Sequence, residues 1–189
     1  DSPTTVMTSN SHDLIAGNST SATFTAYLKN GSNASDIFDI SVVPDGPANW
    51  TTQFTTINGT FPAGTQDAIQ INAGDSSAIN IEVNPNSSNG FCITKINFVS
   101  QSNPNLSGEI VFRNMTETGF EVLILEGASK HSDSLFASLE RVSPLNKAVL
   151  SNNALQSPGL DLSNFDVVAW IPGDQLPVFN TGDHLVLQN

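Results

Sequence analysis

The sequence predicts two kinds of structure in one chain: an all-β sandwich of seven or eight antiparallel strands over residues 1–117, then an incomplete α/β segment over residues 118–189. Three observations predict this division. Apolar and polar residues alternate along the first part, and turn-forming residues separate the alternating runs. Near residue 120 a continuous apolar run is followed by a helical pattern instead. A chain of 189 residues has room for two small cores.

The strands of the first part are predicted from a period of two. Alternating runs lie near residues 22–29, 38–42, 79–83, 92–98 and 108–114. Such alternation is typical of a strand that buries one face. Turn-forming stretches such as NGSNAS (30–35) and PDGPA (44–48) separate the runs. Because no helical period occurs in this part, we expect two antiparallel sheets packed face to face, with Trp50 as the largest residue of their core.

Residues 20–115 resemble the immunoglobulin-like modules of secreted bacterial proteins. The likeness rests on LKNGSNASDIFDISVVPDGPANWTTQF, INAGDSSAINIEVNPNSS and GFCITKINFVSQSN, each of which lies at an expected strand or turn. Cys92 stands where that family usually has Tyr. The resemblance implies an immunoglobulin-like β-sandwich with a spacer, docking or adhesion role, and it transfers no catalytic residue.

The second part opens with FEVLILEG (120–127), a continuous apolar run typical of a strand covered on both faces. A helix is predicted over 132–142, where apolar residues recur at helical spacing before Pro144. Further strands are expected at 146–152 and 166–174, and another helix from Thr181.

This β-α-β-β-α order predicts a parallel, doubly wound sheet. The strands near 120–126 and 166–171 should be parallel neighbours, with the helix crossing between them. Three strands do not complete such a sheet. We therefore expect missing strands in a continuation beyond Asn189 or in a second chain, or else packing of this segment against the sandwich.

The second part also resembles the opening of flavodoxin-like domains of the class I glutamine amidotransferase-like superfamily. The likeness rests on VLILEG, on a helix of Leu135/Leu139 type, and on LDLSNFDVVAW followed by Gly173-Asp174. Only three strands are matched, and the superfamily's nucleophile lies on a later strand-to-helix elbow. The resemblance therefore implies a truncated domain without transferable active-site residues.

Charge excludes two classes of partner. Asp and Glu number 18 against 6 Lys and Arg, for a formal net charge of −12, and the basic residues are dispersed. No basic stripe is available for phosphates, so we expect neither nucleic acid nor anionic membrane surfaces as partners. No apolar run approaches the roughly 18–20 residues that span a bilayer. Because the chain begins at Asp1, we expect a processed product or an excised piece.

Candidate sites in the first part favour structural interpretations. His12 lies in a polar loop with nothing in the local sequence to pair with, and we interpret it as a solvated histidine rather than a ligand. Cys92, the only cysteine, alternates with apolar residues and is expected to be buried, unpaired and unreactive. Five aspartates lie in or near turns without the spacing of a calcium loop, and we interpret them as solvated carboxylates: Asp36, Asp39, Asp45, Asp67 and Asp75. We expect no metal and no cofactor.

One candidate ligand crevice is predicted in the second part. Ligands of open α/β sheets bind beyond the carboxyl ends of the strands. This rule brings together residues after the first and third strands of the segment: Gly127, Ala128, Ser129, Gly173 and Asp174. Tight turns between strands and helices are the alternative explanation. Dinucleotide, Walker-type and flavin-phosphate loops are missing, and consecutive His131, Ser132 and Asp133 cannot form a triad.

Eight Asn-x-Ser/Thr sequons precede the change of pattern, at Asn18, Asn30, Asn33, Asn49, Asn58, Asn86, Asn105 and Asn114. Chance alone would supply about four at this composition. Turns rich in Asn, Ser and Thr account for the excess, with glycosylation as the alternative.

The functional hypothesis is a non-catalytic spacer, docking or adhesion module of a secreted or cell-surface bacterial multidomain protein, in contact with protein or glycan. The alternative is part of a hydrolase or amidotransferase-like enzyme whose active site is completed by residues beyond 189. The two differ in whether a Gly-x-Cys/Ser-x-Gly-type elbow follows Asn189.

Overall fold

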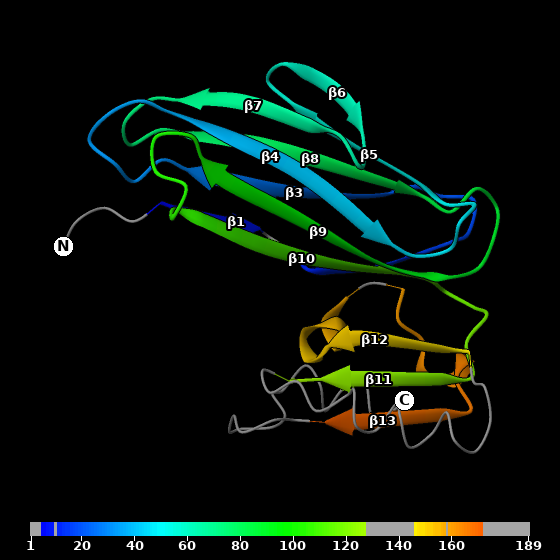
Figure 1. Cartoon of the computed structure of the whole chain (residues 1–189). Helices are drawn as coiled ribbons and strands as arrows, with labels where there is room; N and C mark the ends of the chain where they lie inside the picture. Colours follow the sequence, from blue (N-terminus) through cyan, green and yellow to red (C-terminus); the bar gives the residue numbers. More distant parts are fainter. Residues whose placement is uncertain (1–4, 10, 128–145, 158, 172–189) are drawn as a thin grey trace.

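The structure, a computed structural model, describes residues 5–9, 11–127, 146–157 and 159–171 (Figure 1). Ten strands form two five-stranded sheets, and three more form a smaller sheet beside them. We name the first large sheet the β8 sheet, after its central strand. Its strand order is β1-β3-β8-β5-β6, and these strands are, in the same order, Val6–Ser9, Ala22–Lys29, Ser76–Asn84, Thr51–Thr56 and Gly59–Pro62. We name the second the β9 sheet. Its strand order is β2-β10-β9-β4-β7, and these strands are, in the same order, Asp13–Ala16, Ser107–Thr116, Phe91–Ser100, Asp36–Asp45 and Gln66–Ile71.

The two large sheets enclose the main core. Apolar residues at alternate positions of β3, β8 and β5 face those of β4, β9 and β10, as the period of two predicts. Phe24 of β3 meets Phe112 of β10 across the core, with ring centroids 4.5 Å apart. Phe38 and Phe98, on neighbouring strands of the β9 sheet, make an edge-to-face contact at 6.1 Å. The predicted sandwich is therefore present.

The prediction of seven or eight antiparallel strands is wrong in number and partly in direction. The first strand segment, β1, pairs antiparallel with β3 in one sheet, whereas β2 pairs parallel with β10 in the other. The chain thus changes sheets between Ser9 and Asp13. β1, β2 and β6 have four residues each, too few for a clear alternating pattern.

The smaller sheet, here the β11 sheet, has the order β12-β11-β13. Its strands are Val122–Glu126 (β11), Lys147–Ser151 (β12) and Val167–Ile171 (β13). β11 is parallel to both neighbours, with Val122 opposite Lys147 on one side and Val167 on the other. The positions of these strands and the parallel pairing of β11 with β13 are as predicted.

The predicted α/β class is wrong for the described chain, whose residues include no α-helix. Two short 3-10 helices, Asn152–Gln156 (η1) and Leu162–Asn164 (η2), follow β12 instead. η2 is a single turn in which the Asp161 side chain accepts a hydrogen bond from the Ser163 backbone N–H. η1 ends at its C-cap Ser157, whose backbone is extended, and Gly159 follows in the left-handed conformation at a φ of +92°. The helices predicted over 132–142 and from Thr181 lie outside the described residues.

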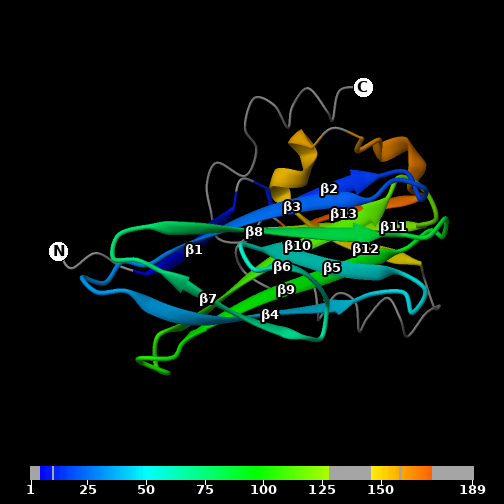
Figure 2. The ribbon, with the colours of Figure 1, turned by 90° about the horizontal axis from the view of Figure 1, so that it is seen from above.

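The β11 sheet packs against the sandwich at its β2–β10 edge (Figures 1 and 2). Ile15 of β2 and Met115 of β10 point away from the main core and join a second cluster with Leu123, Leu125 and Leu150. η1 adds Ala154 and Leu155 to this cluster. The second cluster therefore contains residues from both sides of the predicted 117/118 boundary, and that division stays a prediction.

A buried carboxylate ties β2 to the end of β12. Asp13 is only 3% exposed. It accepts a hydrogen bond from the Ser151 backbone N–H at 3.0 Å and a second, very short one from the Ser151 hydroxyl. A carboxylate at this depth needs such donors, because burial without them is costly. Asp13 thus fixes where β12 meets the sandwich.

We predict that Asp13→Ala destabilises the folded chain by roughly 1–3 kcal/mol, since it leaves the Ser151 backbone N–H buried without its acceptor. Urea unfolding followed by circular dichroism measures the change. Ser151→Ala, which removes only the hydroxyl donor, is the matched control and should cost less. An unchanged midpoint for Asp13→Ala would contradict the role given to this contact.

Candidate functional site

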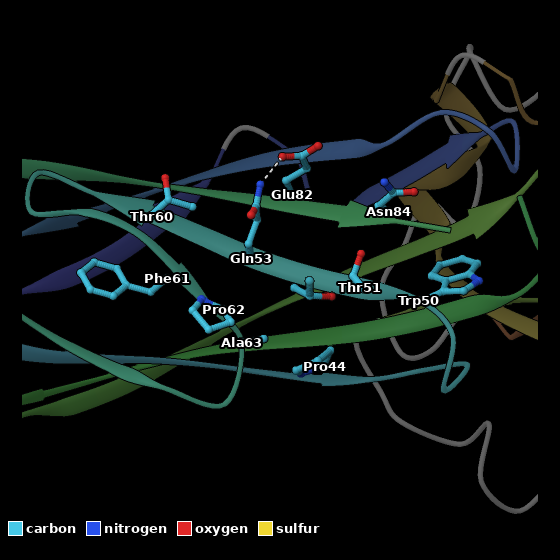
Figure 3. Close-up of a pocket in the computed structure, with 11 residues that line it drawn as sticks. Pro44, Trp50, Thr51, Gln53, Thr60, Phe61, Pro62, Ala63, Glu82 and Asn84 are labelled. Atoms are coloured by element: carbon cyan, nitrogen blue, oxygen red, sulfur yellow. Dashed lines mark hydrogen bonds between the residues drawn. The ribbon is translucent and has the colours of Figure 1, made fainter. Parts of the chain in front are cut away.

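A groove of about 570 Å³ lies where β5 and β6 meet the end of β4 (Figure 3). We call it the β5–β6 groove. Its apolar lining comes from Pro44, Trp50, Phe61, Pro62 and Ala63, and its polar lining from Thr51, Thr52, Gln53, Thr60, Glu82 and Asn84. Its volume falls in the range of small-ligand sites, and most of its lining belongs to strands rather than to loops.

The polar side of the groove follows from strand register. Thr51 lies opposite Asn84, and Gln53 lies opposite Glu82. Val83, between Glu82 and Asn84, and Phe54, next to Gln53, are buried in the core, so the polar side chains project from the opposite face. Phe61 lies opposite Phe54 in register and therefore belongs to the core side of the strand pair. The Gln53 Nε2 group donates to Glu82 Oε2 at 2.7 Å, the contact drawn in Figure 3. We call these four side chains the polar row.

Hydrogen bonds orient the side chains of the polar row but leave some of their polar atoms without a partner. Asn84 Oδ1 accepts from the backbone N–H of Asn86 at 2.9 Å, and Asn86 Nδ2 donates to the Asn49 carbonyl at 2.6 Å. Within the described part of the chain, Gln53 Oε1, Glu82 Oε1 and Asn84 Nδ2 have no hydrogen-bond partner. Two acceptors and one donor with fixed directions therefore face the groove region.

Trp50 closes one end of the groove and is seated in the core, as predicted. It is 8% exposed, and its Nε1–H donates to Ser88 Oγ at 3.0 Å. Ser88 in turn donates to the Pro85 carbonyl at 2.8 Å. A Cβ at Gly90 would lie 3.0 Å from the indole ring and 2.5 Å from Pro47 Cγ, so only glycine lets the β8–β9 loop approach this closely.

A smaller cavity of about 230 Å³ adjoins Trp50 and reaches Cys92. Cys92 is free and 1% exposed, and its sulfur lies 3.6 Å from Thr94 Oγ1. Burial raises the pKa of the thiol, which disfavours the reactive thiolate. The burial predicted from the sequence is confirmed, and the backbone of Gly46 covers the residue closely, since a Cβ there would lie 2.8 Å from Cys92 Cβ.

His12 is exposed, as expected of a solvated histidine, but it has neighbours that its local sequence did not indicate. Its Nδ1 lies 3.2 Å from the Val111 carbonyl and its Nε2 lies 3.4 Å from Ser9 Oγ. The ring also stacks on Phe112 at 5.9 Å. Because β2 pairs with β10, residues 99 positions apart meet here. His12 therefore has a structural setting on the sandwich surface.

Four of the five aspartates accept hydrogen bonds from neighbouring groups, and the five do not converge. Asp36 is buried, so its interpretation as a solvated carboxylate is wrong. Asp67 accepts from Thr56 and Asn58, and Asp39 accepts from Gln101. Burial alone would raise the pKa of Asp36, but hydrogen bonds from Ser100, Ser102 and the Ile37 backbone outweigh it and hold that pKa below its ordinary value. In the described ranges, no group of three or more His, Cys, Asp or Glu side chains could hold a metal ion.

Of the predicted crevice, only Gly127 is described. Its N–H donates to the Ile171 carbonyl at 2.8 Å, which places it at the carboxyl ends of β11 and β13. Ala128, Ser129, Gly173 and Asp174 lie outside the described residues, as do His131, Ser132 and Asp133. The crevice stays a prediction. No helix among the described residues has the length and apolar character needed to cross a membrane.

The β5–β6 groove itself was missed by sequence reasoning. Its lining comes from β4, β5, β6 and β8, and only the strand register brings these residues together. One local signal was available, namely the polar residues Thr51 and Gln53 at alternate positions beside the core residues Trp50 and Phe54.

Several solved structures are similar to this chain in fold. The ASH/PapD-like domain 7 of human CEP192 shares 9% identity over 60% of this chain and 85% of that chain, with a TM-score of 0.38. The N-terminal domain of PorA shares 8% identity over 61% and 89%, with a TM-score of 0.43. CfaE, the adhesive subunit of the CFA/I fimbria of enterotoxigenic Escherichia coli, shares 9% identity over 61% and 49%, with a TM-score of 0.43.

No family model and no curated protein matches the sequence. At these identities, and with TM-scores below 0.5, the structural matches carry no argument about ligand or activity. The groove must be interpreted from its own residues.

We predict that Trp50→Ala lowers the free energy of unfolding by about 3–5 kcal/mol, because it removes a large buried ring and its hydrogen bond to Ser88 Oγ. Urea unfolding monitored by circular dichroism tests this. Tyr27→Ala, which truncates an exposed aromatic of β3, is the control and should have a small effect. Equal midpoints for wild type and Trp50→Ala would show that the ring lies on the surface.

We predict that the Cys92 thiol reacts slowly with Ellman's reagent in the native chain and stoichiometrically after denaturation. Fast labelling without denaturant would contradict its burial.

Alkali gives a second readout of the same burial. Because the folded pKa of Cys92 is raised, the unfolded thiol loses its proton first, near its ordinary pKa of about 8.5. The contribution of Cys92 to stability should therefore fall as pH rises above that value. Cys92→Ala should show a smaller loss of stability than wild type between pH 8 and 10.

Proposed function

We propose that the chain is a non-catalytic binding module of a secreted or cell-surface bacterial protein, and that the β5–β6 groove is its docking surface. The observation that supports this proposal is a cavity at the edge of β5 and β6 whose lining combines an oriented polar row on the outer face, beside Pro62, with apolar residues on the core side. Apolar area contributes affinity, while fixed polar atoms contribute orientation and specificity.

The setting of the groove also favours docking. β5 and β6 are paired through four residue positions, and Phe61 stacks on the buried Phe54 with centroids 5.5 Å apart. Phe54 is completely buried, so this contact attaches β6 to the main core. A rigid strand pair loses little conformational entropy when a partner binds.

The chemistry of the lining favours binding over catalysis. Glu82 is the one carboxylate among the lining residues, and it already accepts a hydrogen bond from Gln53. Among the residues that the structure describes, no His, Lys, Arg or Cys lines the groove. Acid–base chemistry generally uses a positioned pair of titratable groups, which this lining does not supply.

The division of the chain near residue 117 and the crevice at Gly127 belong to the same proposal. The hydrogen bond from Gly127 to Ile171 supports the crevice, because ligands of parallel sheets bind beyond such carboxyl ends. The docking role assigned to the groove does not depend on either.

We predict that the fluorescently labelled chain binds to bacterial cells through the groove. Gln53→Ala/Asn84→Ala removes two members of the polar row and should weaken cell binding at least about fivefold, the loss expected for about 1 kcal/mol. Flow cytometry over a concentration series measures it.

The matched control is Thr25→Ala/Asn80→Ala. Thr25 and Asn80 form a hydrogen-bonded pair at 2.8 Å on the same sheet but do not line the groove. The control should bind cells as wild type does, and urea midpoints should verify that both variants fold. Equal cell binding by wild type and the groove variant would refute the docking role.

A further inference from the structure

We infer that Asn33 and Asn105 are the acceptor sites for N-linked glycans on this chain, and that folding closes the other six sequons to modification. The two sites lie in the sequons NAS (33–35) and NLS (105–107). The inference rests on the secreted or cell-surface setting proposed for the chain, where glycan transfer takes place, but it does not depend on the β5–β6 groove.

Burial closes two of the eight sequons. Asn30 is completely buried, and its Nδ2 group donates to the carbonyls of Ala34 and Ile71, each at 2.9 Å. Asn114 is only 1% exposed and lies opposite Cys92 on the core side of β10. Because the interior of a folded domain is close-packed, neither side chain can carry a saccharide in the folded chain.

Side-chain hydrogen bonds close four more sequons. Each of these asparagines donates from Nδ2 to a group on a neighbouring loop or strand. The acceptors are Asn89 Oδ1 for Asn18, Ser88 Oγ for Asn49, Asp67 and the Ala68 carbonyl for Asn58, and the Asn49 carbonyl for Asn86. Glycan transfer uses the same nitrogen atom, so modification at these positions would disrupt contacts that join the loops.

Asn33 and Asn105 are exposed, and the fold gives no reason for asparagine at either position. Asparagine usually occurs in turns because its side chain bonds a nearby group or because it tolerates a left-handed backbone. Neither side chain has a hydrogen-bond partner within the described ranges. Among the described non-glycine residues, positive φ values occur at Asn86 and Ser87 only. Both structural explanations therefore fail for these two asparagines.

The two sequons lie in neighbouring turns with a common base. Asp36, which directly follows the first sequon, is buried and accepts hydrogen bonds from Ser100 Oγ at 2.5 Å and from the Ser102 backbone N–H at 3.3 Å. These two serines lie just before the second sequon. Figure 1 shows the β3–β4 and β9–β10 turns together at the left end of the sandwich. Both exposed amides are therefore presented from a fixed support.

This end of the sandwich is remote from the groove and from the β11 sheet. β4 and β10 have ten residues each, so each strand spans roughly 33 Å. The first sequon precedes β4, and Pro44 of the groove lies near the far end of that strand. The second sequon overlaps the start of β10, and Met115 contacts the β11 sheet near its far end. Glycans at these sites leave both regions uncovered.

The reaction uses a transferase and a lipid-linked saccharide, both supplied by the cell. The Asn Nδ2 atom attacks the anomeric carbon of a saccharide held on a polyprenyl diphosphate. The new N–C bond forms as the C–O bond to the diphosphate breaks. The lipid diphosphate leaves with the bonding electrons, and Nδ2 loses one proton to a base of the transferase. Ser35 and Ser107 complete the acceptor sequences, and both are exposed.

Transfer to the purified, folded chain tests the inference. The chain is incubated with a polyprenyl-diphosphate oligosaccharide and an oligosaccharyltransferase that accepts simple Asn-x-Ser/Thr sequons in folded proteins, and peptide mass spectrometry maps the products. We expect the yields at Asn33 and Asn105 to be at least about tenfold above those at every other sequon, because modification elsewhere requires local unfolding first. A smaller difference at either site overturns the inference.

Short peptides show whether the fold makes this selection. Synthetic peptides that contain Asn86 or Asn114 should accept the glycan as readily as peptides that contain Asn33 or Asn105, because their sequons are intact without the fold. If the Asn86 and Asn114 peptides refuse the glycan, local sequence makes the selection and the inference fails.

Substitutions at the third sequon position identify the linkage. Ser35→Ala and Ser107→Ala keep both asparagines, and each should remove one glycan mass from the intact chain. Ser107→Thr should keep the glycan, and the matched control Asn18→Gln should keep both. Urea midpoints verify that the variants fold. Two glycans on the Ser35→Ala/Ser107→Ala chain would overturn the assignment.

Protein isolated from the cells that produce it separates this inference from the proposed function. We expect saccharide on Asn33 and Asn105 of the exported chain. If the exported chain is unmodified at both sites while cell binding still depends on Gln53 and Asn84, the inference fails and the docking role stands. If the sites are modified but the groove variant binds cells as wild type does, the docking role fails alone. A chain found only in the cytoplasm overturns both.

Discussion

The alternation of side chains across each strand is the constraint on which the rest of the molecule depends. Burying Phe24, Phe54 and Ile81 between the two large sheets forces their chain neighbours onto the opposite face. For β5 and β8 this places Gln53 and Glu82 side by side at the groove. For β2 and β10 the same rule turns Ile15 and Met115 away from the main core, toward the β11 sheet. The same packing requirement thus positions both the candidate site and the contact between the sandwich and the β11 sheet.

Long strands and single buried residues could be predicted from the sequence, because their signals are local. Strands of eight to ten residues such as β3, β8 and β10 show several periods of alternation. Trp50 and Cys92 are buried as expected. Which residues lie opposite each other on paired strands could not be predicted, because no local pattern encodes strand pairing. The contact of His12 with Val111 and the position of Thr51 opposite Asn84 both depend on such pairing.

The β11 sheet shows how a correct local prediction can lead to a wrong class. The run from Val122 to Leu125 is fully apolar, and all four residues are buried. Such a run indicates a strand that is buried on both faces, but it does not show which elements pack against those faces. The sequence was interpreted as a strand between layers of helices. In the structure, Leu123 and Leu125 are instead covered by a cluster that includes Ile15 and Met115 of the sandwich. Parallel pairing is compatible with either cover, so it could be predicted while the α/β class could not.

The abundance of Asn, Ser and Thr has two structural meanings, and their difference bears on function. Asn30 is fully buried and donates to the carbonyls of Ala34 and Ile71, so its amide holds a turn together. Thr25 and Asn80 bond to each other on an open strand surface. Both cases are explained by folding and solubility alone. The groove differs because its polar row lies at the edge of a cavity whose lining also includes Phe61 and two prolines. A spacer requires no such combination, since solvated polar faces are sufficient to keep a sandwich soluble. The cavity lined by both kinds of residue is therefore the feature on which the proposed docking role rests.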